Sequence, residues 1–124
     1  MKCTYDEAVK GLIVLVGLRK NKVDGSIAKI FFKLRRTLQE AADFETEQET
    51  LFVEEHGGKI DEATGKVRFD TPELLMAFLD KQKEIRAMEF EYDAPGKYFL
   101  DPAQCGTICD EDMETLTPFI DWKE

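Results

Sequence analysis

The chain has few residues of the types that bind metals or act as nucleophiles. Its three cysteines are Cys3, Cys105 and Cys109, and its only histidine is His56. Two thiolates spaced as in Cys105-x-x-x-Cys109 can share a zinc ion, but the other ligands would have to be Cys3, His56 or carboxylates brought together by the fold. The alternatives for this pair are a structural zinc, an adventitious disulfide and ordinary buried or half-buried thiols. We expect ordinary thiols, with no metal and no cofactor.

Cysteine catalysis would depend on the single imidazole. A catalytic thiol needs an imidazole within hydrogen-bond reach, so every such scheme passes through His56. This residue stands directly before Gly57 and Gly58, where the predicted helix ends and its dipole favours a cation. No phosphate loop, dinucleotide fingerprint, nucleophile elbow or metalloprotease signature occurs. The sequence therefore predicts a protein that is not an enzyme and has no catalytic residues.

Carboxylates dominate the charge, with 26 Asp and Glu against 17 Lys and Arg and a formal net charge of -9. Their abundance means that pairs able to act as acid and base can be found throughout the chain and indicate no particular reaction. One group alternates along a predicted strand, and another stands at a predicted helix start, where negative charge is favoured for structural reasons. We predict that the partner-binding acidic face consists of six residues: Glu89, Glu91, Asp93, Asp110, Glu111 and Asp112.

The net charge also bears on the class of partner. An acidic average field repels phosphate but favours approach to a basic surface, such as that of a nucleic-acid-binding protein. The simpler alternative is that acidity keeps the protein soluble. The basic stretch Lys29, Lys33, Arg35 and Arg36 could contact phosphate, although such a stretch is more often a solvated helix flank. We expect another protein as partner and no direct contact with nucleic acid.

Length and composition indicate one domain, residues 1–124, in a reducing compartment. The chain is close to the commonest domain size of about 100–150 residues, and its three cysteines do not form the even framework of a small secreted protein. Asp6 and Glu7 stand where a signal peptide would be positively charged. The apolar run 12–18 is far shorter than the roughly 20 residues that span a bilayer. We expect a cytoplasmic protein without membrane contact.

Two helices are predicted in the first half of the chain. Thr4-Tyr5-Asp6-Glu7 is the pattern of a capping box and predicts a helix start. The run 12–18 is apolar almost all round and predicts that this helix is well buried. After Asp24-Gly25-Ser26, apolar residues recur at helical spacing without Gly or Pro from residue 26 to residue 56. This pattern predicts one long helix of roughly 40 Å at about 1.5 Å per residue, antiparallel to the first.

The second half mixes short strands with helices. Residues 59–61 and 66–69 flank a turn with Gly and predict a hairpin, and Thr71-Pro72 predicts the start of a third helix. Alternation over 88–92 predicts a strand with 97–100 as its partner, and 110–116 a short helix. The predicted fold class is α+β: an antiparallel long-helix pair with a third helix, a small β-hairpin and a short antiparallel strand pair.

This order of elements resembles that of small proteins of unknown function encoded by tailed bacteriophages and prophages. The stretches that carry the resemblance are 52–61 (FVEEHGGKID), 89–93 (EFEYD) and 113–120 (METLTPFI). The resemblance implies an accessory phage protein in the host cell, whose partner is a host or phage protein. Such a family supplies no catalytic residues to carry over.

Two roles remain open for such a protein. One is an inhibitor of a host defence nucleoprotein, of anti-CRISPR type, that binds through its acidic face. The alternative is a virion or tail assembly accessory protein that oligomerises through its long helices. The inhibitor needs a contiguous carboxylate patch, whereas the assembly protein needs an exposed apolar seam along Ile27 to Phe52.

Overall fold

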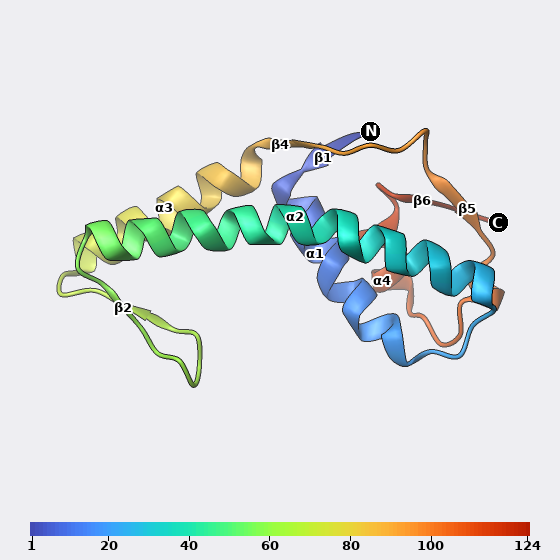
Figure 1. Ribbon diagram of the computed structural model, residues 1–124, viewed down its shortest axis with the longest axis horizontal. Coiled ribbons are helices and arrows are strands. Elements are labelled where there is room, and N and C mark those ends of the chain that lie inside the picture. Colours follow the sequence, from blue (N-terminus) through green and yellow to red (C-terminus); the bar gives the residue numbers. More distant parts are fainter.

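The structure, a computed structural model, describes all of residues 1–124. Its longest element, α2 (Gly25–Glu55), runs along the whole molecule, and the other elements are arranged on it (Figure 1). The other helices are α1 (Tyr5–Gly17), α3 (Pro72–Ala87) and α4 (Asp110–Leu116), with 3-10 turns η1 (Leu18–Lys20) and η2 (Pro102–Gln104). The strands are β1 (Lys2–Thr4), β2 (Lys59–Ile60), β3 (Val67–Arg68), β4 (Glu89–Glu91), β5 (Tyr98–Leu100) and β6 (Ile120–Trp122). The predicted α+β class is confirmed.

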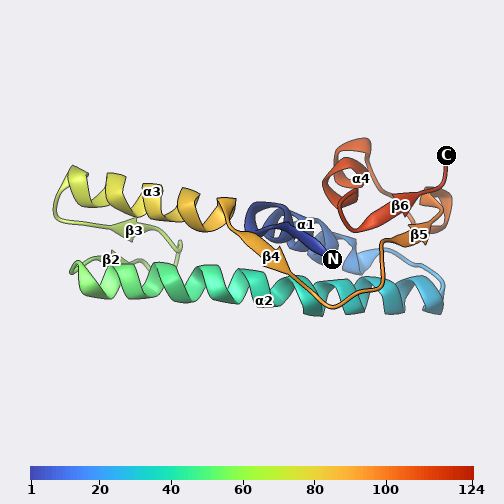
Figure 2. The ribbon, with the colours of Figure 1, turned by 90° about the horizontal axis from the view of Figure 1, so that it is seen from above.

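The molecule has two parts that share α2. The main lobe contains α1, α4, the N-terminal half of α2 and the strands β1, β4, β5 and β6 (Figure 1). The arm, residues 46–85, contains the C-terminal half of α2, the β2–β3 hairpin and nearly all of α3. Seen from above, α3 lies alongside α2 (Figure 2), and the hairpin hangs below both helices in the view of Figure 1. The arm therefore projects from the main lobe and carries its own small set of contacts.

The start of α1 confirms the predicted capping box. The amide of Glu7 donates to Thr4 Oγ1 at 3.1 Å, and the amide of Thr4 donates to Glu7 Oε1 at 2.9 Å. The helix is less buried than predicted, because Ile13 is 66% exposed and Val16 49% exposed. The helix packs chiefly on α2 and also on α3 and α4, so the apolar run 12–18 is wider than the surface that covers it.

The long helix begins and ends within one residue of the prediction. Past its C-terminus Gly57 adopts a φ of 69°, and the amide of Gly58 donates to the carbonyl of Val53 at 2.8 Å. This is the bond of a Schellman motif, which requires a residue tolerant of positive φ. No helix in the structure, α2 included, combines the length and the apolar character needed to cross a membrane.

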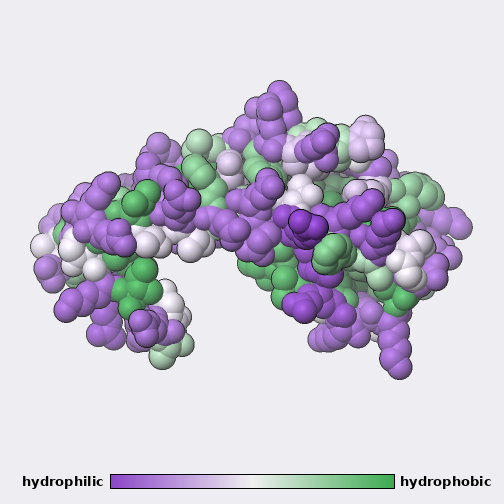
Figure 3. Space-filling model, viewed as in Figure 1, coloured by the Kyte–Doolittle hydropathy of each residue, from purple (hydrophilic) through white to green (hydrophobic).

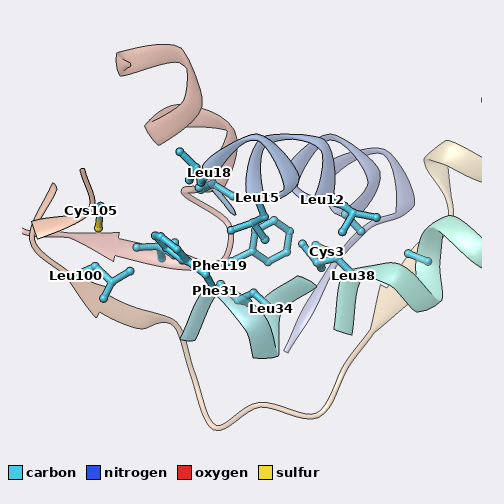
Figure 4. Close-up of a cluster of buried hydrophobic side chains, with 14 of the residues drawn as sticks. Cys3, Leu12, Leu15, Leu18, Phe31, Leu34, Leu38, Leu100, Cys105 and Phe119 are labelled. Atoms are coloured by element: carbon cyan, nitrogen blue, oxygen red, sulfur yellow. The ribbon is translucent and has the colours of Figure 1, made fainter. Parts of the chain in front are cut away.

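The core of the main lobe forms where α1 crosses α2. Phe31 and Leu38 of α2 pack with Leu15 of α1 and with Phe119 from the C-terminal segment (Figure 4). At Gly11 the helix comes so close to this segment that a Cβ atom would lie 2.7 Å from the Phe119 ring. The apolar stripe of α2 is therefore occupied by the chain's own residues. The buried members of that stripe are Ile27, Phe31, Leu34, Leu38 and Ala41.

The strand pairing differs from the prediction. The strand β4 pairs antiparallel with β1, with Cys3 opposite Phe90, and not with residues 97–100. Those residues form β5, which pairs in parallel with β6. A parallel pair needs a crossover of a dozen residues or more, and the segment containing η2 and α4 provides it. The predicted partner was wrong because the N-terminal strand, only three residues long, shows no periodicity that would have identified it.

The arm is held together by a small aromatic cluster. Three phenylalanine rings meet here, with centroids 5.6 to 5.8 Å apart. They belong to Phe52 of α2, Phe69 just after β3, and Phe78 of α3. The predicted hairpin is confirmed, with Ile60 opposite Val67. The predicted cap of α3 is confirmed too, since Thr71 Oγ1 accepts from the amide of Leu74 at 3.3 Å. These contacts fold the chain back along α2.

Adjacent residues of α2 test its orientation. Phe31 is 2% exposed and Phe32 is 49% exposed. We expect Phe31→Ala to lower the free energy of unfolding by about 3–5 kcal/mol, because it leaves a cavity in the core. Phe32→Ala should change it by less than about 1 kcal/mol. Chemical denaturation followed by circular dichroism measures both values, and equal losses would contradict the orientation of α2 described above.

Candidate functional site

One guanidinium joins three helices where the arm meets the main lobe. Glu45, in the middle of α2, is the only buried charged residue, at 6% exposure. Arg86, in the last turn of α3, donates from Nε to Glu45 Oε2 at 2.9 Å and from Nη2 to Glu45 Oε1 at 2.9 Å. Its Nη1 donates to Asp6 Oδ1 of α1 at 3.1 Å. This two-bond geometry is the strong form of an arginine–carboxylate contact.

The charges at this junction stabilise one another. Hydrogen bonds from Lys10, and then from Arg86, lower the pKa of Asp6, and hydrogen bonds to Glu45 and Asp6 raise the pKa of Arg86. Because the pKa of Asp6 is lower in the folded chain, its stabilising effect is present above the unfolded value of about 3.9 and is lost as the pH falls through the folded value. All these groups bind partners within the chain, so the junction is a structural ion-pair network.

One turn further along α2, Glu49 continues the polar contact between α2 and α3. Gln82 Nε2 donates to Glu49 Oε1 at 2.7 Å. Burial raises the pKa of Glu49, while the Gln82 hydrogen bond opposes the rise. The amide thus helps to keep this half-buried carboxyl charged beside Glu45.

The predicted acidic strand carries exposed carboxylates, but a lysine lies among them. Glu89 and Glu91 of β4 lie on either side of Lys2, whose Nζ is 3.9 Å from Glu89 Oε2 and 3.4 Å from Glu91 Oε1. The three side chains are about 60% exposed, so the pairs contribute little stability. Asp93 is exposed past the end of the strand, in a cleft that it shares with Lys29 of α2. Cations therefore interrupt this row of carboxylates.

The other predicted carboxylates form a separate group. Asp110, Glu111 and Asp112 occupy the first turn of α4, where negative charge is favoured, and none of them forms an ion pair within the chain. The helix α4 and the strand β4 do not lie side by side in either view (Figures 1 and 2). The structure thus places the six predicted residues on two surfaces.

The cysteines and the histidine do not come together. Cys3 and Cys105 are buried in the main lobe and Cys109 is exposed, whereas His56 lies at the far end of α2, stacked on Phe52 at 4.1 Å (Figure 1). Burial raises the pKa of the Cys3 thiol to about 11 and also raises that of Cys105. No group of three His, Cys, Asp or Glu side chains could hold a metal ion.

The arm leaves large apolar side chains in contact with solvent, with exposures of 41% to 62%. They come from α2, the hairpin and α3: Leu51, Ile60, Leu75, Met76 and Leu79. A cleft of about 460 Å³ lies at the base of the hairpin, lined by Phe69, Pro72 and Leu75 among others. Figure 3 shows apolar atoms on the arm and a hollow between the hairpin and the main lobe.

This exposed surface was not predicted. In the sequence, Leu74, Leu75, Phe78, Leu79 and Ile85 recur at helical spacing, which predicts one apolar face. Only Phe78 and Ile85 of α3 are buried. The available signal was the excess of apolar residues in the first two turns, where all six residues from Leu74 to Leu79 are apolar. That stripe is wider than α2 and the hairpin can cover.

No protein-family model, curated protein or solved structure matches this chain. The surfaces available to a partner are the arm, the two acidic groups, and the basic stretch Lys29, Lys33, Arg35 and Arg36 of α2.

Substitutions of Glu45 and Arg86 test whether their ion pair stabilises the fold. We expect Arg86→Met to lower the free energy of unfolding by about 3 kcal/mol, because it leaves Glu45 without its partner. The double variant Glu45→Met with Arg86→Met should recover most of that loss, since two apolar side chains remove the buried charge. Urea denaturation measures both, and Lys83→Met, at an exposed position of the same helix, is the control. A single variant no worse than this control would contradict the structural role of the junction.

Thiol reactivity tests the burial of the cysteines. In the native protein we expect one thiol, Cys109, to react quickly with an aromatic disulfide reagent at pH 8, because it alone is exposed. Cys3 and Cys105 should react only as the protein opens, since burial and a raised pKa both suppress the thiolate. Cys109→Ser should abolish the fast phase. Two or three fast thiols in the folded protein would be incompatible with the core shown in Figure 4.

Proposed function

We propose that this chain is a non-enzymatic, phage-encoded accessory protein that works in the host cytoplasm by binding another protein through its arm. The observation that supports this most is the set of apolar side chains exposed on the arm, headed by Met76 at 62% exposure. Leaving apolar surface in water costs about 25 cal/mol per Å². Large apolar side chains exposed together on one part of a protein commonly mark an interaction site.

A role in virion or tail assembly suits this surface better than inhibition by charge. Binding through Leu75, Met76 and Leu79 would depend on apolar contact and would tolerate salt. Oligomerisation along the stripe from Ile27 to Phe52 is not part of the proposal, because α1 and the core of the main lobe already occupy most of that stripe. The partner is a phage or host protein that covers the arm.

A second candidate is the acidic inhibitor of a host defence nucleoprotein. Its support is the excess of carboxylates over cations together with the exposure of Glu89, Glu91 and Asp93 along one edge of the main lobe. Lys2 lies between the first two and weakens the field there. The two candidates use different surfaces, so substitutions can separate them.

Affinity capture with paired variants tests the proposal. Tagged protein is incubated with lysate from phage-expressing cells at low and high salt, and the retained proteins are identified by mass spectrometry. We expect Met76→Asp with Leu79→Asp to lose the partner at both salt concentrations, because it places charge in the apolar contact. Glu89→Lys with Glu91→Lys, which reverses the acidic strand, should keep the partner.

The opposite pattern would favour the second candidate: a partner released by salt and lost from the acidic-strand variant alone. Retention of the same partner by both variants would contradict both proposed surfaces. Far-UV circular dichroism confirms that each variant is folded, as expected for substitutions at exposed positions.

A further inference from the structure

The cations of this acidic protein are strongly segregated. Residues 19–36 contain seven Lys or Arg and one acidic residue, Asp24, whereas the rest of the chain has ten cations and 25 carboxylates. None of the seven forms an ion pair, because all ion pairs in the structure involve Lys2, Lys10, Arg86 or Lys123. Although the chain has many carboxylates, none of them pairs with the cations of residues 19–36.

An exposed aromatic side chain lies within this basic region. Phe32 is 49% exposed, and the guanidinium carbons of Arg35 and Arg36 lie 6.0 and 5.8 Å from its ring centroid. Next to it is an open cleft of about 610 Å³ between α2 and the segment leading to β5, lined by Lys29, Lys33, Arg36 and Tyr98 among others. Cations and two aromatic side chains therefore border the same cleft.

The fold gains little from this arrangement. Lys29 and Lys33 are one turn apart on α2, where like charges destabilise a helix. Beside the groove, burial and then the positive charge of Arg19 lower the pKa of Arg35. Phe32 contributes nothing to the buried core. A bound polyanion would relieve the repulsion and cover the ring.

We infer that this basic groove, formed by Lys29, Phe32, Lys33, Arg36 and Tyr98, binds single-stranded nucleic acid. Lysine and arginine side chains would contact successive phosphates, and the aromatic rings would stack on unpaired bases, the combination used by proteins that bind single strands. Rings at a groove cannot stack on bases paired within a duplex, which argues against double-stranded DNA.

The negative net charge does not prevent this contact. Charges are screened over about 8 Å at physiological ionic strength, so the local excess of cations decides what approaches the groove. Two carboxylates, Glu40 and Asp93, also line the cleft. They would repel a phosphate placed beside them, and we therefore expect the backbone to follow Lys29, Lys33 and Arg36.

Lys29, Lys33 and Arg36 of the groove belong to the N-terminal half of α2, and the arm lies at the other end of this helix (Figure 1). The helix has 31 residues and at about 1.5 Å per residue separates its ends by about 45 Å. Both surfaces could therefore be occupied at once, so the chain would link a nucleic-acid strand to a protein. The inference does not depend on the arm, because binding at the groove can be measured with the purified protein alone.

Fluorescence anisotropy with labelled oligonucleotides tests the inference. The probes are mixed-sequence 12-nucleotide single strands of DNA and RNA, the corresponding DNA duplex, and a polyglutamate peptide, at several salt concentrations. The groove variant carries Lys29→Ala, Lys33→Ala and Arg36→Ala. The control carries three substitutions on the arm, which remove the same charge from exposed positions: Lys59→Ala, Lys66→Ala and Lys83→Ala.

We expect the wild type to bind a single strand more tightly than the duplex or polyglutamate. The groove variant should lose at least about tenfold in affinity, and its salt slope should fall by about one for each phosphate contact removed. Phe32→Ala should lose about fivefold or more without a change in salt slope, because it removes stacking and no charge. The arm control should stay within about twofold of the wild type.

Three results would overturn the inference. The first is that neither single strand binds at low salt. The second is that the groove variant and the arm control lose equal affinity. The third is that duplex or polyglutamate binds as tightly as a single strand, or more tightly. The last result would identify the groove as a site for a duplex or an acidic protein. Circular dichroism of each variant excludes unfolding as the cause of a loss.

Discussion

The arginine–carboxylate junction at Arg86 determines how the two parts of the molecule are joined. Its guanidinium satisfies the buried Glu45 of α2 with two hydrogen bonds and reaches Asp6 of α1 with a third. A buried carboxylate without a partner would cost several kcal/mol. The end of α3 must therefore lie against both α1 and the middle of α2. The next residues of the chain then start β4 beside β1, and the backbone bond from Tyr5 N to Met88 O at 3.0 Å continues that contact.

This constraint gives the molecule its two separated surfaces. The arm is held at one end by the aromatic cluster around Phe78 and at the other by Arg86. The apolar stripe of α3 that faces neither α2 nor the hairpin stays exposed. At the other end of α2, Phe31 packs into the core while Phe32, one residue on, points to solvent among unpaired cations. One straight helix thus places an apolar surface and a basic groove at opposite ends.

The elements set by local interactions could be predicted from the sequence, and the contacts between distant segments could not. The cap at Thr4, the Gly57-Gly58 stop and the Thr71-Pro72 start depend on residues within one turn of each other, and all three are present. The pairing of β4 with β1 joins residues almost ninety positions apart. It depends on where α3 ends, which in turn depends on Arg86, and no periodicity in the sequence shows that connection.

The candidate surfaces show the same division. The six acidic positions could be located from alternation and helix-start signals. Tertiary contacts determine that they separate onto the β4 and α4 surfaces and that Lys2 lies between Glu89 and Glu91. The basic stretch Lys29, Lys33, Arg35 and Arg36 could likewise be located from the sequence. That Lys29, Lys33 and Arg36 border a cleft with Tyr98 follows from tertiary contacts. The exposed part of α3 could not be separated from its buried part, because both are apolar and which part is covered depends on α2 and the hairpin.

Hydrogen exchange of the backbone amides tests most directly whether Arg86 holds the arm to the main lobe. In the wild type the amides of α3 should be protected along the helix. In Arg86→Met the amides of α3 and of the hairpin should exchange much faster, while those of α1 and of the N-terminal half of α2 keep their protection. That result would show the arm opening as a unit when the junction is lost. Unchanged protection of α3, or an equal loss over the whole chain, would contradict the account.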